Sequence, residues 1–555
     1  MKQLGEFDYV IVGAGSAGCV IAARLSESGV YSVALLEAGG EANDFWVGVP
    51  LGWAKLYKEK KYNWGYLSEP QKALNGMRSF QSRGKLIGGT GSLNGMVYLR
   101  GQREDFQLWR QLGNVGWSYE DVLPYFKKSE GNEWGECEYH GVGGPLKITS
   151  CPSSELGAAF IKSGIQAGYP YNKDFNSPIQ EGFGQAQVNM YNGRRWSTAV
   201  AFLKPARKRT NLTVITNALA SRILFKDKRA VGVELKRAGL VESIKARREV
   251  IVAGGAFNSP QLLQLSGVGP VQLLKRFDIP VVVDLPGVGS NLHDHFTYNV
   301  GYLCTQKLTL NDAIYHPVRR MLMGMNYAFF RKGFLTTNGQ AAQGMVRSDP
   351  RLGAPDLMFR LRLFTRSAGT TIVSKAPGSQ FDIGIALLHT ESRGSVRIKS
   401  ADSAVHPEIR LNTFTTENDQ RKAVEGFWIH RKIMSMPAMQ PYVAKDLEGT
   451  SQFKTDEEVL AYCRQKGDAQ LHTSSSCRMG IDDDAVVDSR LRVYGVEGVR
   501  IIDASIMPFC VGANTNATTI MIGEKGAAMV LEDATLRHSG PGPTFCSPFQ
   551  NLTLR

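Results

Sequence analysis

The sequence lacks the cysteine patterns that mark metal-bound or disulfide-stapled proteins. Its eight cysteines include no CxxC pair and no regular spacing, so neither a zinc site nor a disulfide framework is predicted. Reduced thiols and a cytoplasmic location fit this pattern best.

Long hydrophobic runs are also missing. No uninterrupted apolar stretch reaches the roughly 18 residues that are needed to span a bilayer. The first residues, MKQLGEFDYVIVGAG, enter a predicted strand almost at once and leave no room for a signal peptide. We therefore expect a soluble protein or one attached peripherally to the inner face of a membrane.

The charge is strongly basic, but the pattern of a nucleic-acid surface is absent. The formal net charge is +14. The densest basic clusters, residues 204–209 and 245–248, contain no aromatic side chains on which bases could stack. We expect no nucleic-acid partner, whereas loose contact with an anionic membrane stays open. The oligomeric state also stays open.

The 555 residues contain no low-complexity tract or short-period repeat, and their length predicts more than one domain. A strand over 7–12, a helix over 17–25 and a strand over 32–36 form a predicted βαβ unit. Buried strands of the same kind recur at 249–253 and 499–503, so one sheet is expected to gather distant segments.

These segments predict an α/β fold (α+β overall), with a Rossmann-like cofactor domain and an interleaved substrate-binding domain. The second domain has mixed polar and apolar patterns with aromatics such as Phe359, Phe364, Phe381, Phe427 and Trp428. The predicted ranges are 1–155, 202–301 and 467–532 for the cofactor domain, 156–201 and 302–466 for the substrate domain, and 533–555 for an irregular C-terminal tail.

A glycine-rich turn follows the first predicted strand. Residues 13–18 read GAGSAG, the pattern G-x-G-x-x-G, in which glycines let the backbone approach a pyrophosphate and helix N-terminal amides face it. Glu37 closes the second strand at the expected distance and can accept hydrogen bonds from a ribose. The sequence therefore predicts a dinucleotide site. This motif alone leaves FAD and NAD open.

A second glycine-rich segment favours FAD. Residues 84–95 read GKLIGGTGSLNG, a loop that a simple nicotinamide-binding domain does not need. At this point the chain resembles the glucose-methanol-choline (GMC) oxidoreductases, whose first signature matches residues 84–94. Their second signature resembles residues 255–269, and their GVGxNLxDH motif resembles residues 287–295. The resemblance extends from about residue 7 to 532. The bacterial branch that includes choline, aliphatic-alcohol and sorbose dehydrogenases is nearest.

The resemblance implies an FAD-dependent enzyme that oxidises a CH–OH group of an alcohol, a polyol or a choline-like substrate. Leu93 stands where some members carry a histidine bonded to FAD, so the cofactor is expected to be noncovalent. No metal is expected. The implied cofactor-binding residues are Gly13, Gly15, Ser16, Ala17, Gly18, Glu37, Ala38, Gly88, Gly89, Asn94, Asp503, Ala504 and Thr515.

Alcohol oxidation needs a base for the hydroxyl proton, and histidine suits this task because its pKa is ordinarily near neutrality. By the resemblance, His472 before the CRMG run is the base. Asn514 in NTNATTIMI is its partner at the alcohol oxygen. Residues 473–476 depart from the proline-containing run that is usual in bacterial relatives, which weakens any transfer of substrate preference.

Several alternatives stay open or are disfavoured. An FAD-containing lyase of the hydroxynitrile type keeps a similar histidine and is the main alternative. A light-driven decarboxylase is disfavoured because Leu388 replaces its cysteine, and a noncatalytic flavoprotein or a nicotinamide enzyme is disfavoured by the motifs above.

His293 and His295 flank Asp294 and are expected in a structural loop near FAD rather than in a metal site. The electron acceptor is left open among oxygen, a quinone and a soluble carrier.

Overall fold

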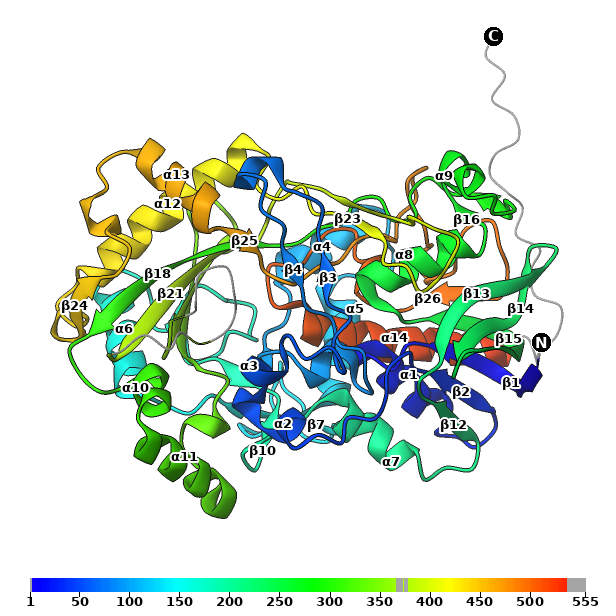
Figure 1. The fold of residues 1–555 in the computed structure, drawn as a ribbon, viewed down its shortest axis with the longest axis horizontal. Coiled ribbons are helices and arrows are strands. Elements are labelled where there is room, and N and C mark those ends of the chain that lie inside the picture. Colours follow the sequence, from blue (N-terminus) through cyan, green and yellow to red (C-terminus); the bar gives the residue numbers. More distant parts are fainter. Residues whose placement is uncertain (1, 366–372, 374–377, 537–555) are drawn as a thin grey trace, which may run out of the picture.

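Two seven-stranded sheets organise the protein and lie at opposite ends of its long axis (Figure 1). The computed structural model describes residues 2–365, 373 and 378–536. The first sheet has the order β12-β2-β1-β15-β14-β13, with β26 paired to β15. Its strands are β1 (Lys2–Val12), β2 (Val33–Leu36), β12 (Leu212–Ile215), β13 (Leu219–Lys226), β14 (Arg229–Arg237), β15 (Leu240–Val252) and β26 (Val499–Ile501).

The predicted gathering of distant strands is confirmed. β1 pairs in parallel with β2 on one side and β15 on the other, and the far end of β15 pairs in parallel with β26. Continuous apolar runs such as residues 9–12 suit these strands because both faces of this part of the sheet are covered. β1 begins at Lys2 rather than at the predicted Phe7, since its first residues pair with the long β15.

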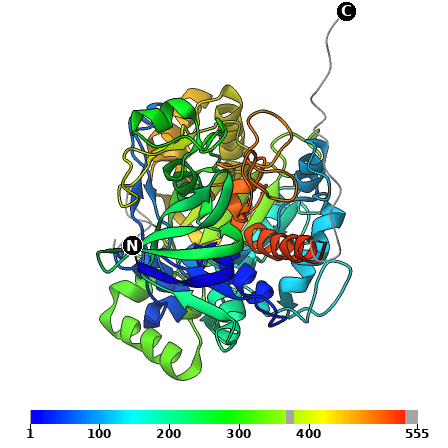
Figure 2. The ribbon, with the colours of Figure 1, turned by 90° about the vertical axis from the view of Figure 1, so that its right-hand side faces the viewer.

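Two helices pack together on the first sheet. α1 (Ser16–Leu25) follows β1, and α14 (Thr515–Leu536) runs along it, with Gly523 next to Ala17. Figure 2 shows α14 in red beside the blue and green strands. The helix continues past the predicted start of the tail at 533, because Asp533 forms ion pairs with Arg490 and Arg500. The rest of the predicted tail, 537–555, lies outside the described residues.

The second sheet is antiparallel, with the order β24-β18-β21-β20-β19-β8 and β25 paired to β18. Helices α6 (Glu155–Gln166), α12 (Glu417–Met434) and α13 (Asp456–Lys466) contribute to the apolar core on one of its faces. β18 starts inside the range assigned to the cofactor domain, and the domain division itself stays a prediction. The strands are β8 (Gly182–Gly184), β18 (Phe296–Cys304), β19 (Gln340–Val346), β20 (Leu357–Arg362), β21 (Gln380–Leu387), β24 (Val443–Asp446) and β25 (Asp468–Ala469).

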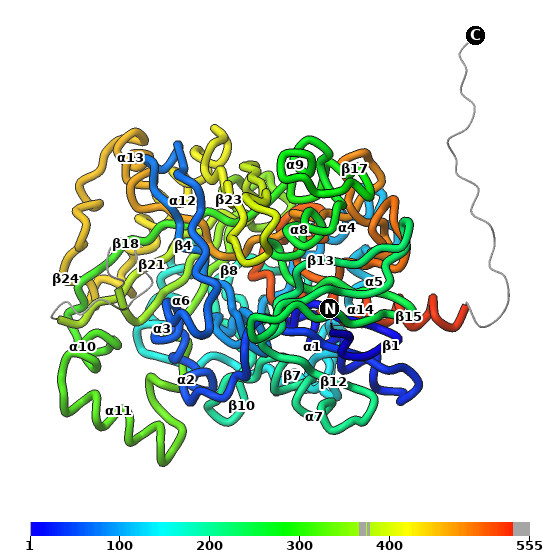
Figure 3. Tube along the Cα trace, turned by 45° about the vertical axis from the view of Figure 1, so that its right-hand side comes forward, coloured from blue at the N-terminus to red at the C-terminus, as the bar shows by residue number. Residues whose placement is uncertain are grey.

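Shorter elements join the two sheets. α10 (Leu310–Tyr315) and α11 (Pro317–Phe330) project from the body beside the second sheet (Figures 1 and 3). The remaining helices and strands are α2 (Phe45–Gly48), α3 (Trp53–Leu56), α4 (Arg103–Gln111), α5 (Tyr119–Ser129), α7 (Lys204–Ala206), α8 (Gly255–Leu265), α9 (Val271–Arg276), β3 (Tyr66–Leu67), β4 (Phe80–Gln81), β5 (Val97–Tyr98), β6 (Glu130–Asn132), β7 (Leu146–Ser150), β9 (Gln187–Val188), β10 (Met190–Tyr191), β11 (Arg194–Arg195), β16 (Val268–Gly269), β17 (Val283–Asp284), β22 (Ser395–Arg397) and β23 (Glu408–Arg410).

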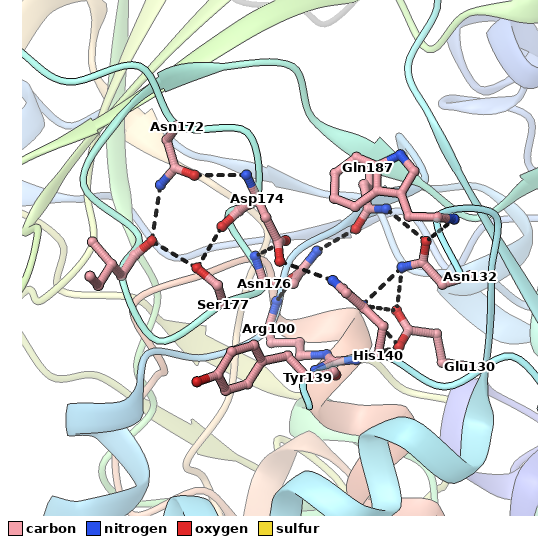
Figure 4. A network of polar contacts seen from close by, with 12 residues as sticks. Arg100, Glu130, Asn132, Tyr139, His140, Asn172, Asp174, Asn176, Ser177 and Gln187 are labelled. Carbon is pink, nitrogen blue, oxygen red and sulfur yellow. Dashed lines mark hydrogen bonds and ion pairs between the residues drawn. The ribbon is translucent and has the colours of Figure 1, made fainter. Parts of the chain in front are cut away.

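A buried polar network links the segments around residues 100, 130, 140 and 174 (Figure 4). Arg100 forms an ion pair with Glu130 at 2.6 Å, and His140 bridges Glu130 and Asp174 at 3.1 and 3.0 Å. Burial opposes the charge on His140, but its hydrogen bonds to Asp174 and Glu130 raise its pKa to about 9. The network is therefore charged at neutral pH and its charges are paired, as burial requires.

Within the described part of the chain, no helix is long and apolar enough to cross a membrane. The seven cysteines that fall in it are all unpaired.

Candidate active site

One cavity of about 410 Å³ extends between the two sheets. Its walls come from the carboxyl ends of β1 and β2, from the inner face of β19 and β20, and from the segments around His472 and Asn514. The carboxyl edge of a parallel sheet is where α/β folds bind their ligands.

In the turn after β1, two glycines pack closely against neighbouring backbone and a third borders the cavity. A Cβ on Gly13, which has a φ of +103°, would lie 2.5 Å from the Ala253 carbonyl oxygen, and one on Gly18 would lie 1.8 Å from the Gly13 oxygen. A Cβ on Gly15, by contrast, would meet nothing within 4 Å, and Gly15 lines the cavity. α1 begins at Ser16 without a side-chain cap. The cavity wall therefore offers backbone amides and open space to an anion.

Glu37 is buried at the end of β2. Its carboxylate accepts hydrogen bonds from the amides of Ala14 and Gly39, at 3.0 and 2.8 Å. Burial raises the pKa of Glu37 to about 7, against the opposing effect of these two hydrogen bonds. Hydrogen bonds from further donors, such as ribose hydroxyls, would stabilise the charged form of this buried carboxylate.

The second glycine-rich segment packs directly on the first turn. A Cβ on Gly89 would lie 2.8 Å from the Cα of Gly15. Asn94 lines the cavity, and its Oδ1 accepts a hydrogen bond of 2.9 Å from Arg195, which is buried. Arg195 thus holds the loop in place, a role that its position in the sequence did not signal.

Other predicted residues fall along the same cavity. Asp503 accepts hydrogen bonds from the Gly255 amide at 2.8 Å and from the Ser259 hydroxyl at 2.6 Å. The Ser16 hydroxyl donates to Asn516 Oδ1 at 2.7 Å and so joins the starts of α1 and α14. Also in the lining are Gly13, Ala17, Ala38, Ala504 and Thr515.

Two predicted cofactor residues, Gly18 and Gly88, do not line the cavity. A Cβ on Gly88, whose φ is +88°, would lie 2.2 Å from the Ser92 hydroxyl oxygen. Both glycines are required by packing of the turns that form the wall.

At the far end of the cavity, His472 and Asn514 meet across 42 residues of sequence. Asn514 Nδ2 lies 2.9 Å from His472 Nε2, and His472 Nδ1 lies 2.9 Å from His295 Nδ1. His295 Nε2 lies 3.0 Å from the Val511 carbonyl oxygen, which can only accept.

These contacts fix the histidine tautomers. Since the Val511 carbonyl oxygen accepts a hydrogen bond from His295 Nε2–H, Nδ1 of His295 carries a lone pair. This Nδ1 atom accepts a hydrogen bond from the N–H group at His472 Nδ1. The Nε2 atom of His472 is then unprotonated and accepts from the Asn514 amide. The structure thus brings an imidazole with an unprotonated Nε2 to the cavity, with a hydrogen-bond partner on each side of the ring.

The same residues have low proton affinity. Burial, the neighbouring His295 and the positive charges of Arg360 and Arg83 hold the pKa of His472 well below its ordinary value of 6.5. Burial likewise lowers the pKa of His295 to about 3. Both rings are neutral near pH 7.

Asp294 positions the two histidines through their backbone. Its carboxylate accepts from the amides of His472 and His295, each at 2.8 Å, and from that of Leu471 at 3.1 Å. Asp294 and His295 were expected only in a structural loop. The contact of His295 with His472 spans 177 residues, and the NLHDH run of the sequence did not indicate it.

His293 has other partners. Its Nδ1 accepts from the Cys510 amide at 2.9 Å, and its Nε2 lies 2.9 Å from the Thr390 carbonyl oxygen. Among the described residues, no cluster of three or more His, Cys, Asp or Glu side chains could hold a metal ion.

Two family models match this chain. Both are described as GMC oxidoreductase, the N-terminal one over residues 7–297 and the C-terminal one over residues 390–523.

Curated relatives cover nearly the whole chain. An oxygen-dependent choline dehydrogenase of Pseudomonas putida is 41% identical over 528 residues, or 94% of this chain and 93% of the relative. One of Rhizobium johnstonii is 40% identical over 542 residues, or 97% and 98%. Among solved structures, pyridoxine 4-oxidase from Mesorbium loti is 29% identical with a TM-score of 0.86, over 95% of this chain and 99% of that one. A formate oxidase is 25% identical with a TM-score of 0.89, over 96% and 99%.

Proposed function

The chain belongs to the GMC oxidoreductase family, as an FAD-dependent enzyme acting on CH–OH donors, and on this premise we propose that His472 is its base. The observation that carries the proposal is the unprotonated Nε2 of His472 at the cavity wall beside the Asn514 amide. A base must be within hydrogen-bond reach of the hydroxyl whose proton it removes.

The residues of the cavity fit FAD. Open space at the Cβ position of Gly15 and the uncapped start of α1 suit the pyrophosphate, and buried Glu37 suits the adenosine ribose. With FAD bound in this orientation, Asn94 and the start of α14 would lie near its flavin ring. Leu93 offers no atom for a bond to the flavin, so we propose that FAD is held noncovalently.

Bound FAD supplies the hydride acceptor at N5, and the protein manages the proton. A substrate hydroxyl that enters between His472 and Asn514 donates to His472 Nε2 and accepts from Asn514 Nδ2. Asn514 Oδ1 is buried and has no hydrogen-bond partner in the described structure, which leaves it available to a bound molecule. His472 starts neutral and takes up the proton as the carbonyl forms, while the Asn514 amide stabilises negative charge on the oxygen.

The charges around the reacting end bear on the substrate. Arg83 and Arg360 line the cavity and act electrostatically on His472, whereas Arg362, also in the lining, is paired with Asp382 at 2.6 Å. Of the described lining residues only Glu37 and Asp503 are acidic, and both carboxylates already accept from backbone amides. A quaternary ammonium group would find like charges here. We therefore propose an uncharged or anionic alcohol as the substrate, although curated relatives are named for choline.

An anaerobic panel of aliphatic, aromatic, polyol, hydroxy-acid and choline substrates tests the proposal, with flavin bleaching as the readout. We expect bleaching by uncharged or anionic alcohols at much lower concentration than by choline. Preference for choline would refute the charge argument, and product formation with the flavin still oxidised would indicate the lyase alternative. Admission of air afterwards distinguishes oxygen from other acceptors.

The affinity for FAD should depend on pH through Glu37. Its pKa is about 7 in the free protein and ordinarily 4.5, and ribose hydroxyls favour the charged form. Binding therefore releases a proton below about pH 7, so the affinity rises between pH 4.5 and 7, by at most about tenfold per pH unit, and then levels.

The control variant is Glu37→Gln, which should bind FAD about 1 to 3 kcal/mol more weakly and without this dependence. Fluorescence titration of the apoprotein with FAD measures both quantities. An identical pH dependence in the variant would contradict the assignment of Glu37.

His295 is expected to act as a positioning residue. Without its Nδ1 acceptor, His472 can place its proton on Nε2, and His295→Ala should slow substrate-driven flavin reduction roughly tenfold. Its loss also removes one cause of the low pKa of His472, so the acid limb of the rate profile should move to higher pH.

Stopped-flow reduction at several pH values measures this effect. His295→Gln, which restores an oxygen acceptor, should recover part of the rate. His293→Gln is the matched control, because His293 contacts Thr390 and Cys510 instead of His472. An unshifted acid limb in His295→Ala would show that His295 has no influence on the base.

A further inference from the structure

Helix α11 carries a row of exposed apolar side chains. They follow the spacing i, i+3, i+4, i+7 and i+11, which places them on one side of the helix. Tyr327, half a turn away from Met325 and Phe329, is only 2% exposed and faces the protein. The exposed row, called the α11 stripe below, consists of Val318 (62% exposed), Met321 (59%), Leu322 (54%), Met325 (47%) and Phe329 (73%).

The opposite side of α11 is anchored. Tyr327 packs in an apolar cluster with Leu335 and Phe364, and its ring also contacts Phe45 edge to face, with centroids 6.2 Å apart. Since this side packs against the body of the protein, the exposed α11 stripe faces away from it. Figures 1 and 3 show that the helix itself projects from the body. A contiguous apolar patch of this kind marks an interaction site.

Cations flank the stripe and acids are absent from it. The sequence contains no Asp or Glu from residue 313 to 348. Arg319 and Arg320 lie in the first turn of α11, and Arg331 and Lys332 follow its end. Arg319 forms an ion pair with Asp312 just outside this range. An apolar face with basic ends and no acidic residue complements an anionic lipid surface.

We propose that α11 docks the enzyme on an anionic bilayer, with the α11 stripe inserted among the headgroups and acyl chains and the basic ends near lipid phosphates. A second copy of the chain fits the stripe less well. If two α11 helices packed antiparallel about a twofold axis, Arg319 and Arg320 of one would face Arg331 and Lys332 of the other, without an acidic residue of either segment between them.

Flotation of the FAD-loaded enzyme with vesicles tests the proposal. The wild type should float with phosphatidylcholine vesicles that contain phosphatidylglycerol, and much less with phosphatidylcholine alone. Met325→Glu with Phe329→Glu should lower binding roughly tenfold or more, because two apolar side chains that insert into the bilayer are lost. Ile481→Glu is the matched control, since Ile481 is equally exposed (74%) but lies elsewhere, and it should bind as the wild type does.

Two further measurements complete the test. Arg331→Ala with Lys332→Ala should lower binding to the anionic vesicles several-fold and weaken its dependence on salt. All variants should keep their FAD and be reduced by alcohol at the wild-type rate, so a failure of docking is distinct from a failure of the catalytic proposal. Equal flotation of wild type and the α11 variant would overturn the proposal. So would a lipid-free dimer, seen by sedimentation velocity, that the Met325→Glu and Phe329→Glu changes dissociate.

Discussion

His472→Ala should slow flavin reduction by the best alcohol roughly 10²- to 10⁴-fold, the usual contribution of a positioned general base. Without the imidazole, the hydroxyl proton must leave to water while the hydride departs. The fold and FAD content should persist, because the His472 side chain lines the cavity and its backbone is held by Asp294 independently of the ring. Anaerobic stopped-flow reduction measures the rate, and absorbance of the released flavin measures occupancy.

The pH profile separates a base from a residue that only fills space. Since the pKa of His472 lies well below 6.5, the base is neutral above its pKa and the wild-type rate should be level around neutrality. The rate should fall only as acid protonates Nε2, and His472→Ala should lack that fall. Asn514→Ala should slow reduction less, because water can replace part of a neutral hydrogen bond. Near-normal reduction by His472→Ala would require a different base.

Gly15→Ala should weaken FAD binding roughly 10²-fold while leaving the apoprotein folded. The added methyl group meets no protein atom within 4 Å and enters the cavity where the cofactor's pyrophosphate would approach the backbone. Losing two charge-assisted hydrogen bonds there costs about 3 kcal/mol, or roughly 10²-fold in affinity. Titration with FAD gives the affinity, and thermal unfolding of the apoprotein reports the fold.

Two other alanine substitutions serve as comparisons for Gly15→Ala. Gly18→Ala places its methyl 1.8 Å from the Gly13 oxygen, so it should destabilise the apoprotein as well as weaken FAD binding. Gly48→Ala has open space around its Cβ and lies outside the cavity lining, and it should change neither. If Gly15→Ala bound FAD normally, the proposed path of the pyrophosphate would be wrong.

Local patterns carried the sequence-based prediction of the cofactor half of the molecule. The βαβ unit, the glycine turn and Glu37 lie within the first 40 residues, where strand and helix periodicity are direct signals. The gathering of β1, β15 and β26 in one sheet followed from buried runs of the same kind. The meeting of His472 and Asn514 came from the family resemblance instead, since periodicity carries no information on a contact across 42 residues.

The sequence could not predict what depends on long-range packing. His295 touches His472 only because the segments 293–295 and 470–474 pair. The α11 stripe has a readable helical spacing, but such a row ordinarily faces the core. Only the burial of Tyr327 on the other side showed that it faces outward. The continuation of α14 past residue 532 could not be predicted, because the ion pairs of Asp533 involve the distant side chains of Arg490 and Arg500.

The cavity has a consequence for synthesis of the protein in the cell. Its lining runs from Val12 to Thr519 in sequence, and β26, close to the end of the chain, completes the sheet that β1 begins. Domains usually fold on the ribosome from the N-terminus onward, but here the nascent chain cannot form the complete FAD site until Thr519 has emerged. A ribosome that stalls before Thr519 leaves a product that lacks part of the cofactor cavity.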